Sequence, residues 1–140
     1  MQTVLEVKQV TKQYSQQYAL DHVSLSIQKG DIYGLIGKNG AGKTTLLKTI
    51  SRLIHANSGT VSVFGSQNSK EWNEALRKIG TVIETPVAYN QMTAYQNLNY
   101  YCKVHQIAQP DQLIKETLAY VGLSNTGTVS YTHLTLPTSD

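Results

Sequence analysis

The chain has 140 residues, a length that suits one ordinary domain. Hydrophobic residues make up 40% and charged residues 15%, which excludes a disordered chain, because disorder goes with few apolar residues and a high net charge. The formal charge is +3 and the lysines are scattered, so nothing points to a nucleic-acid partner, and we expect none.

The single cysteine, Cys102, excludes an intramolecular disulfide and is compatible with a reducing cytosol. We expect it to be a buried core residue. The four histidines lie far apart without metal-ligand spacing. The first ten residues carry no signal peptide, and no apolar run approaches the roughly 20 residues of a membrane span. We therefore expect a cytoplasmic chain, which can still lie against a membrane protein.

Five segments show the apolar patterns that are typical of strands. Val23, Leu25 and Ile27 alternate with serines, which predicts a half-buried antiparallel strand. The continuous apolar run 32–37 is typical of a strand that is buried on both faces. We expect strands over residues 4–14, 19–27, 32–37, 60–65 and 81–86.

Four segments show helical periodicity. Asn68 is a candidate N-cap, Thr93 with Gln96 forms a capping box, Pro110 starts a helix, and Gly122 is a natural residue for the end of one. We expect helices over residues 44–54, 68–80, 93–107 and 110–123. Strands and helices alternate after an antiparallel start, so the fold class is α/β.

The strongest chemical signal is "GKNGAGKTT", residues 37–45, which fits the phosphate-loop pattern G-x-x-x-x-G-K-[ST]. Its glycines let backbone N–H groups wrap a phosphate. Lys43 can place a positive charge between the β- and γ-phosphates, and the Thr44 hydroxyl can ligate Mg²⁺. The helix that follows presents its N-terminal dipole to the anion. The pattern therefore predicts a nucleotide-phosphate site.

The loop and its flanks, "VTKQYSQQYALDHVSLSIQKGDIYGLIGKNGAGKTTLLKTISRLIHANSGTVSVFG", resemble the ATP-binding subunit of an ATP-binding-cassette (ABC) transporter without a gap. The resemblance covers residues 3 to about 127. It implies an incomplete P-loop NTPase (ABC ATPase) core with an N-terminal antiparallel β part and the start of a helical subdomain.

The same resemblance implies ATP and Mg²⁺ as ligands. Tyr14 sits where the family stacks an aromatic ring on adenine, although Tyr18 is an alternative and an ordinary surface tyrosine is another. The nucleotide-binding residues are expected to be Tyr14, Gly37, Lys38, Asn39, Gly40, Ala41, Gly42, Lys43, Thr44 and Thr45. The metal is expected at Thr44 and Glu84.

Glu84 is a departure from the family pattern, which has Gln at this place in the form I-G-x-V-x-Q; this chain reads "IGTVIETP". A carboxylate keeps an oxygen for Mg²⁺ or water, loses the amide donor and adds a charge. Glu here resembles the bacitracin-export and lantibiotic-immunity branch, in which the ATP subunit powers export of peptide antibiotics. The alternative is an exposed carboxylate at a strand end.

The segment "MTAYQNL" (92–98) resembles the start of the family's helical subdomain, which docks on a membrane permease. The resemblance thus implies a permease subunit, a second ATP-binding subunit in a dimer, and a peripheral place on the inner face of the cell membrane. Four tyrosines form either a docking surface or ordinary helix packing: Tyr89, Tyr95, Tyr100 and Tyr101.

Three family motifs are missing from the sequence: the signature "LSGGQ", the Walker B segment and the switch His. Where the signature should begin, the chain reads "TVSYTHLTLPTSD", which is either a natural strand or, as we expect, a translated transposon-based sequencing adaptor. We therefore expect 1–127 to be the N-terminal part of the ATP-binding domain and 128–140 to be a non-native tail.

Three functions remain open at the level of sequence. The first is a part of an ABC exporter's ATPase subunit, with peptide antibiotics as one candidate cargo. The second is part of a soluble ABC-type ATPase of translation or DNA repair. The third, which we favour for these 140 residues, is an inert piece with weak nucleotide binding at best and no hydrolysis.

Overall fold

The computed structural model describes residues 2–66, 69–84 and 88–124. The chain divides into two compact units, Met1–Thr85 and Pro86–Asp140. No helix among the described residues is long and apolar enough to cross a membrane. The elements are β1 (Thr3–Tyr14), β2 (Gln17–Gln28), α1 (Lys43–Ile50), β3 (Ser58–Val63), α2 (Ser69–Leu76), α3 (Ala94–Val104) and α4 (Pro110–Tyr120).

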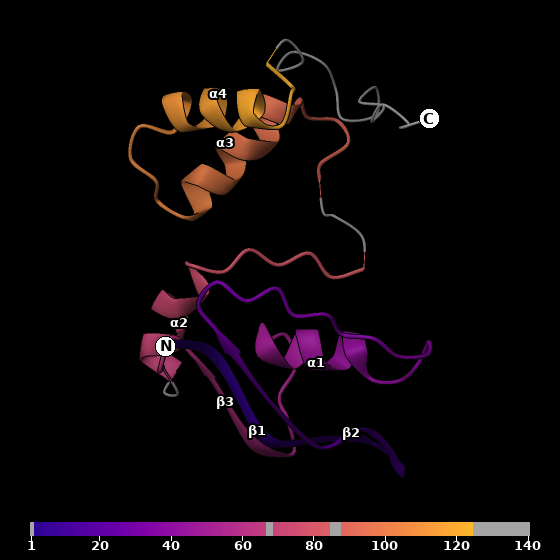
Figure 1. The fold of residues 1–140 in the computed structure, drawn as a ribbon. Coiled ribbons are helices and arrows are strands. Elements are labelled where there is room, and N and C mark those ends of the chain that lie inside the picture. The colour runs from indigo at the N-terminus through magenta and orange to yellow at the C-terminus, as the bar shows by residue number, and fades with distance from the viewer. Residues whose placement is uncertain (1, 67–68, 85–87, 125–140) are drawn as a thin grey trace. The chain divides into compact units, whose positions relative to one another are not determined.

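The first unit contains a three-stranded antiparallel sheet in the order β2-β1-β3 (Figure 1). The strands predicted over 4–14 and 19–27 are confirmed, and the strand predicted over 60–65 is found two residues earlier, at Ser58–Val63. The register shifts between Val7, paired with Leu25, and Val10, paired with Val23. Gln9 has φ 49° at this irregularity, which is a β-bulge. The extra residue lets Val7 and Val10 point to the same face although they are three positions apart.

One face of the sheet carries the core of the first unit. α1 packs on it through Leu46, which is buried with Val7, Val10 and Leu20. α2 packs through Trp72 and Ala75 against Val63, and Leu5 and Val61 touch both groups. A side chain in a strand points to one face only, so both helices cover the same face. The amphipathic stripes of the two helices therefore meet the alternating apolar residues of the strands.

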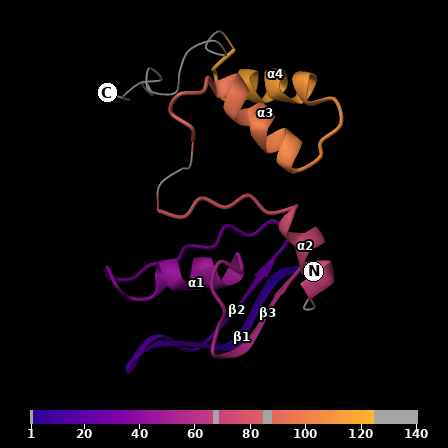
Figure 2. The same ribbon diagram turned by 180° about the vertical axis from the view of Figure 1, so that it is seen from behind.

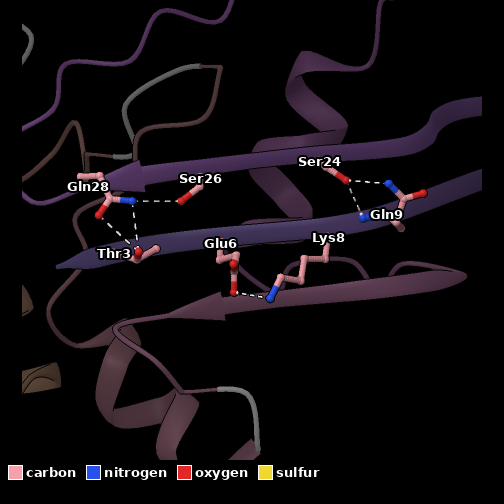
Figure 3. Close-up of polar contacts among 7 residues, drawn as sticks. All are labelled: Thr3, Glu6, Lys8, Gln9, Ser24, Ser26 and Gln28. Atoms are coloured by element: carbon pink, nitrogen blue, oxygen red, sulfur yellow. Dashed lines mark hydrogen bonds and ion pairs between the residues drawn. The ribbon is translucent and has the colours of Figure 1, made fainter. Parts of the chain in front are cut away.

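The opposite face of β1 and β2 is polar, and Figure 3 shows its contacts. Glu6 and Lys8 form an ion pair of 2.9 Å, and the Ser24 hydroxyl accepts hydrogen bonds from the backbone and side-chain nitrogens of Gln9 at 2.9 Å. The Gln28 amide donates to Thr3 at 3.1 Å. These contacts are exposed and add little stability each, but they fix the solvent side of the hairpin.

The second unit pairs α3 with α4 (Figure 2). The predicted capping box is confirmed, since Gln96 N–H donates to Thr93 Oγ1 at 3.1 Å and Thr93 N–H donates to Gln96 Oε1 at 2.9 Å. α4 is followed by Gly122 (φ 74°), and Leu123 N–H donates to the Leu118 carbonyl at 2.7 Å. Cys102 is buried in this core, as the sequence predicted.

Two predicted strands are absent from the described residues, and all four helices end before the predicted residue, with α3 ending at Val104 and α4 at Tyr120. The run 32–37 forms no strand and is exposed, with Ile32 and Ile36 about fully so (103% and 97%). The described part of 81–86 forms no strand either, and Val82 is 69% exposed. Such a strand needs hydrogen-bonding strands along its edges and covering layers on both faces, and within the described part of the chain neither segment pairs with another strand.

The helix predicted over 44–54 ends at Ile50, and Leu53 is 66% exposed. The helix predicted over 68–80 ends at Leu76. Its predicted N-cap, Asn68, lies outside the described residues, as does the tail 128–140.

Candidate functional site

The loop of residues 37–45 leads into α1 through two glycines in the left-handed region. Gly40 has φ 82° and Gly42, the N-cap of α1, has φ 90°. A Cβ on Gly42 would lie 2.1 Å from the carbonyl oxygen of Ala19, in β2. This closeness requires glycine at 42 on two grounds, backbone conformation and space. The phosphate-loop pattern indicates the need for a left-handed backbone at Gly42, but only the structure shows the lack of space for a side chain.

A pocket of about 340 Å³ lies at the N-terminus of α1, lined by Ala19, Asn39, Gly40, Gly42, Lys43, Thr44 and Thr45. The first backbone N–H groups of a helix have no acceptor within it, and within the described chain no side chain caps α1. The first turn of α1 also has no acidic residue. The pocket therefore combines unpaired donors with the positive end of the helix dipole, which suits an anion.

Lys43 provides the positive charge of the site. Its Nζ donates to the carbonyl oxygens of Gly37 and Lys38, the second at 2.7 Å. The ammonium thus closes a ring across the loop. A compact, mobile cation at this position can exchange these carbonyls for phosphate oxygens.

The residues present fit a nucleoside triphosphate with Mg²⁺. Backbone donors, Lys43 and the close glycine backbone match phosphate oxygens, and the Thr44 hydroxyl is an oxygen ligand of the kind that Mg²⁺ takes. Among the described residues, no group of three or more His, Cys, Asp or Glu side chains can hold a metal without the nucleotide. A metal here would therefore take phosphate oxygens of the nucleotide among its ligands.

Tyr14 lies at the end of β1, paired with Gln17 across the hairpin. Its ring is 50% exposed, and Lys12 Nζ lies 5.1 Å from the ring centroid. It does not line the phosphate pocket, whereas Ala19 further along β2 does. The exposed ring has surface on which a base could stack, but its role toward adenine stays a prediction, as does that of Tyr18, which is 56% exposed.

Glu84 lies beyond α2, with φ 67° and its side chain 63% exposed. Its carboxylate forms an ion pair of 3.2 Å with Lys48 of α1. Lys48 lies four positions after Thr44, so the two face the same side of the helix. Sequence reasoning did not single out Lys48; this i, i+4 spacing from Thr44 was the available signal.

A larger pocket, of about 740 Å³, lies in the second unit and is lined by Ala88, Tyr89, Asn90, Gln91, Met92, Gln96, Asn99, Tyr100 and Lys103. The rings of Tyr89 and Tyr100 meet edge to face at 5.1 Å. A hydrogen bond with the Tyr100 hydroxyl raises the pKa of the Tyr89 phenol. Tyr95 instead packs on the core and donates to Asp111 at 2.6 Å. Tyr101 is 38% exposed and lies edge to face with Tyr100 at 5.8 Å. Tyr89, Tyr100 and Tyr101 therefore belong to the surface, and Tyr95 belongs to the helix packing.

Asn97 shapes the wall of this second pocket. It is 7% exposed, accepts from Tyr89 N–H at 2.7 Å, and donates to the carbonyls of Tyr89 and Thr93 at 3.1 Å. One buried amide thus holds the segment before α3 against the helix. Nothing in the sequence indicated this role, because Asn is ordinarily an exposed residue.

The chain is similar to ATP-binding proteins of transporters. The family model described as "ABC transporter" matches residues 20–136. The bacitracin transport ATP-binding protein BcrA of Bacillus licheniformis is 38% identical over 125 residues, which are 89% of this chain and 40% of the relative. The lantibiotic transport ATP-binding protein SrtF of Streptococcus pyogenes is 35% identical over 123 residues, 87% of this chain and 51% of the relative.

A solved structure of the ATP-binding subunit of an ABC transporter superimposes with a TM-score of 0.80 at 26% identity. It covers 94% of this chain, which in turn spans 56% of the solved one. The chain thus spans about half or less of the length of these relatives. With the phosphate loop in place and both comparisons in agreement, the chain belongs to the ABC transporter family and shares the fold of its ATP-binding subunits.

Proposed function

We propose that this chain binds ATP with Mg²⁺ as the phosphate-loop part of the ATPase subunit of an ABC exporter of peptide antibiotics. The pocket at the start of α1 carries the proposal, because helix donors, glycine backbone and Lys43 converge on it. Bound ATP would supply the energy for transport in the whole protein. Within this chain, Lys43 would hold the phosphates and Thr44 the metal, and Glu84 is the further candidate ligand.

The cargo and the cellular place are inferred from the relatives. Their names assign them to bacitracin and lantibiotic transport, and Glu84 resembles the same branch. We therefore infer a subunit that works as a dimer on the cytoplasmic face of the membrane, held there by a permease.

The second pocket supports the permease contact. Tyr89 and Tyr100 remain 43% and 41% exposed while forming one edge-to-face pair, and Asn97 fixes the backbone beside them. A preformed surface with aromatic rings and few charges suits a protein partner. We propose that this pocket receives a segment of the permease.

Titration with a fluorescent ATP analogue, N-methylanthraniloyl-ATP, tests the nucleotide proposal. The chain is expected to bind weakly, and Lys43→Ala should weaken binding by about tenfold or more, because a charge-assisted contact is lost. Lys29→Ala, which removes an exposed lysine from the turn before the 32–37 segment, is the matched control and should change little. Equal binding by the Lys43→Ala chain would refute the assignment.

A further inference from the structure

A second cavity of the first unit lies at the other end of α1 from the phosphate loop. Its volume is about 260 Å³, and it shares no lining residue with the pocket at the start of α1. The end of α1, the turn that follows it, β3 and α2 form its walls. The function proposed above uses none of the residues that line this cavity.

Trp72 lines the cavity, and its indole N–H lacks an acceptor. The side chain is fully buried, at 0% exposed, and Nε1 has no hydrogen-bond partner among the described residues. A buried donor without an acceptor costs free energy, and nearly all such groups in folded proteins are paired. An acceptor bound in the cavity that Trp72 lines would remove this cost.

Arg52 adds a positive charge next to this donor. Its Cζ lies over the Trp72 ring, 4.2 Å from the ring centroid, so the guanidinium covers one face of the indole. The φ of Arg52 is 56°, a left-handed conformation that costs an arginine free energy and persists where tertiary contacts hold it. A guanidinium has five N–H donors in one plane, so Arg52 can donate to a ligand while it keeps its other contacts.

The cavity as a whole suits a small carboxylate. Arg52 and Trp72 supply N–H donors, and none of the described residues that line the cavity is acidic. The end of α1 is the negative end of its dipole and opposes an anion, so the attraction has to come from Arg52. An apolar wall for a short carbon chain is formed by Ile54, Ala56 and Val61. The volume lies below the roughly 300–1,000 Å³ of pockets for drug-sized ligands, which limits the ligand to a few carbon atoms.

We propose that this cavity binds a small aliphatic carboxylate, whose oxygens accept hydrogen bonds from the Trp72 indole N–H and the Arg52 guanidinium. Trp72 is fixed in the core with Val63 and Ala75, whereas Arg52 is partly exposed. Arg52 is therefore the side chain that turns away from the indole to admit the ligand. The site is separate from the nucleotide site, and the proposal does not depend on ATP binding.

The experiment uses Trp72 as its own reporter, because it is the single tryptophan of the chain and gives one indole N–H resonance. The full chain, isotope-labelled at nitrogen, is titrated with sodium butyrate at constant ionic strength and followed by nuclear magnetic resonance. We expect a saturable downfield shift of the indole resonance, since a carboxylate oxygen becomes its acceptor. Butyramide, a neutral molecule of the same shape, should need a concentration about tenfold higher for the same shift.

Arg52→Met should weaken butyrate binding by about tenfold, because the charged donor is removed. Lys78→Met is the matched control and should bind butyrate as the unchanged chain does. Lys78 Nζ also lies over an aromatic ring, 6.0 Å from the Phe64 centroid, but neither residue lines the cavity. Circular dichroism checks that each variant is folded.

Three results would overturn the proposal. An indole shift that does not saturate would show that the cavity holds no carboxylate, and equal effects of butyrate and butyramide would show that charge plays no part. A folded Arg52→Met chain that binds butyrate as tightly as the unchanged chain would exclude the guanidinium. If Arg52→Met does not fold, the comparison of butyrate with butyramide on the unchanged chain still decides the question.

Discussion

At the scale of single residues, Gly42 links the phosphate loop to the sheet. Its missing side chain lets the loop backbone approach the Ala19 carbonyl of β2, and its φ of 90° starts α1 at the angle that forms the pocket. The loop is thus shaped by the hairpin behind it as well as by its own glycines.

Gly42→Ala should destabilise the chain by more than the roughly 1–2 kcal/mol of a left-handed alanine, because the new Cβ would overlap the Ala19 carbonyl. Urea unfolding followed by circular dichroism measures the change. Gly30→Ala is the matched control, since Gly30 also has positive φ (94°) but open space around it. Similar losses from both substitutions would argue against a steric role for position 42.

Residue-level signals in the sequence were reliable where their cause is local. The phosphate-loop pattern, the Thr93 cap and the Gly122 end all depend on neighbours within a few positions, and the structure places most of the loop residues around one pocket. Lys48 was missed because its partner Glu84 is 36 positions away. Asn97 contacts residues close in sequence, Tyr89 and Thr93, and was missed because Asn is ordinarily an exposed residue.

At the scale of elements, the predictions of strands over 32–37 and over the described part of 81–86 were wrong, whereas the hairpin is confirmed and the four helices exist but end earlier than predicted. β1 and β2 are adjacent in sequence and complete their ladder with each other. A strand buried on both faces depends on remote partners, which a window of sequence does not contain. The β1 bulge at Gln9 is a further non-local feature, because it depends on the register with β2.

Asp111 joins the two helices of the second unit, accepting from Tyr95 of α3 and pairing with Lys115 of α4 at 2.7 Å. The Lys115 contact first, and then the Tyr95 hydroxyl, hold the pKa of Asp111 below its usual value. A depressed folded pKa gives stability that is present above the ordinary value of about 4 and is lost as pH falls through the folded pKa.

We therefore expect the helical unit to lose stability on acidification below about pH 4, and Asp111→Asn to reduce that dependence. Thermal melts followed by far-ultraviolet circular dichroism from about pH 6 to about pH 3 measure it. Glu116→Gln removes an acid from the same helix without touching the Tyr95 contact, and should leave the dependence in place. An unchanged pH profile in Asp111→Asn would exclude this contact as its source.

At the scale of the whole molecule, the apolar segment before the phosphate loop is uncovered. Ile32, Tyr33, Leu35 and Ile36 are all at least 40% exposed and follow one another closely. A contiguous exposed apolar run is a site of association. The local loop geometry forms nonetheless, because the α1 end and the Gly42 contact with β2 hold it.

The chain should consequently bind anilinonaphthalene sulfonate and self-associate at high concentration. Substituting Ile32 and Ile36 together with Ser should reduce both, as measured by dye fluorescence and by analytical ultracentrifugation. Val104→Ser, at an exposed position on α3 (58%), is the control and should change neither. Dye binding that is undiminished by the double substitution would place the associating surface elsewhere.

Lys43 reaches back to the carbonyls of its own loop, and this has a kinetic consequence. The Lys43 ammonium bridges two carbonyls of its own loop, so a contact within the chain holds the loop in its curved form. A phosphate that binds here would replace the two carbonyls as the partner of the Lys43 ammonium, and it would not have to order a flexible loop. Little ordering entropy is then lost on arrival, and the residence time depends on how readily the lysine returns to its own backbone.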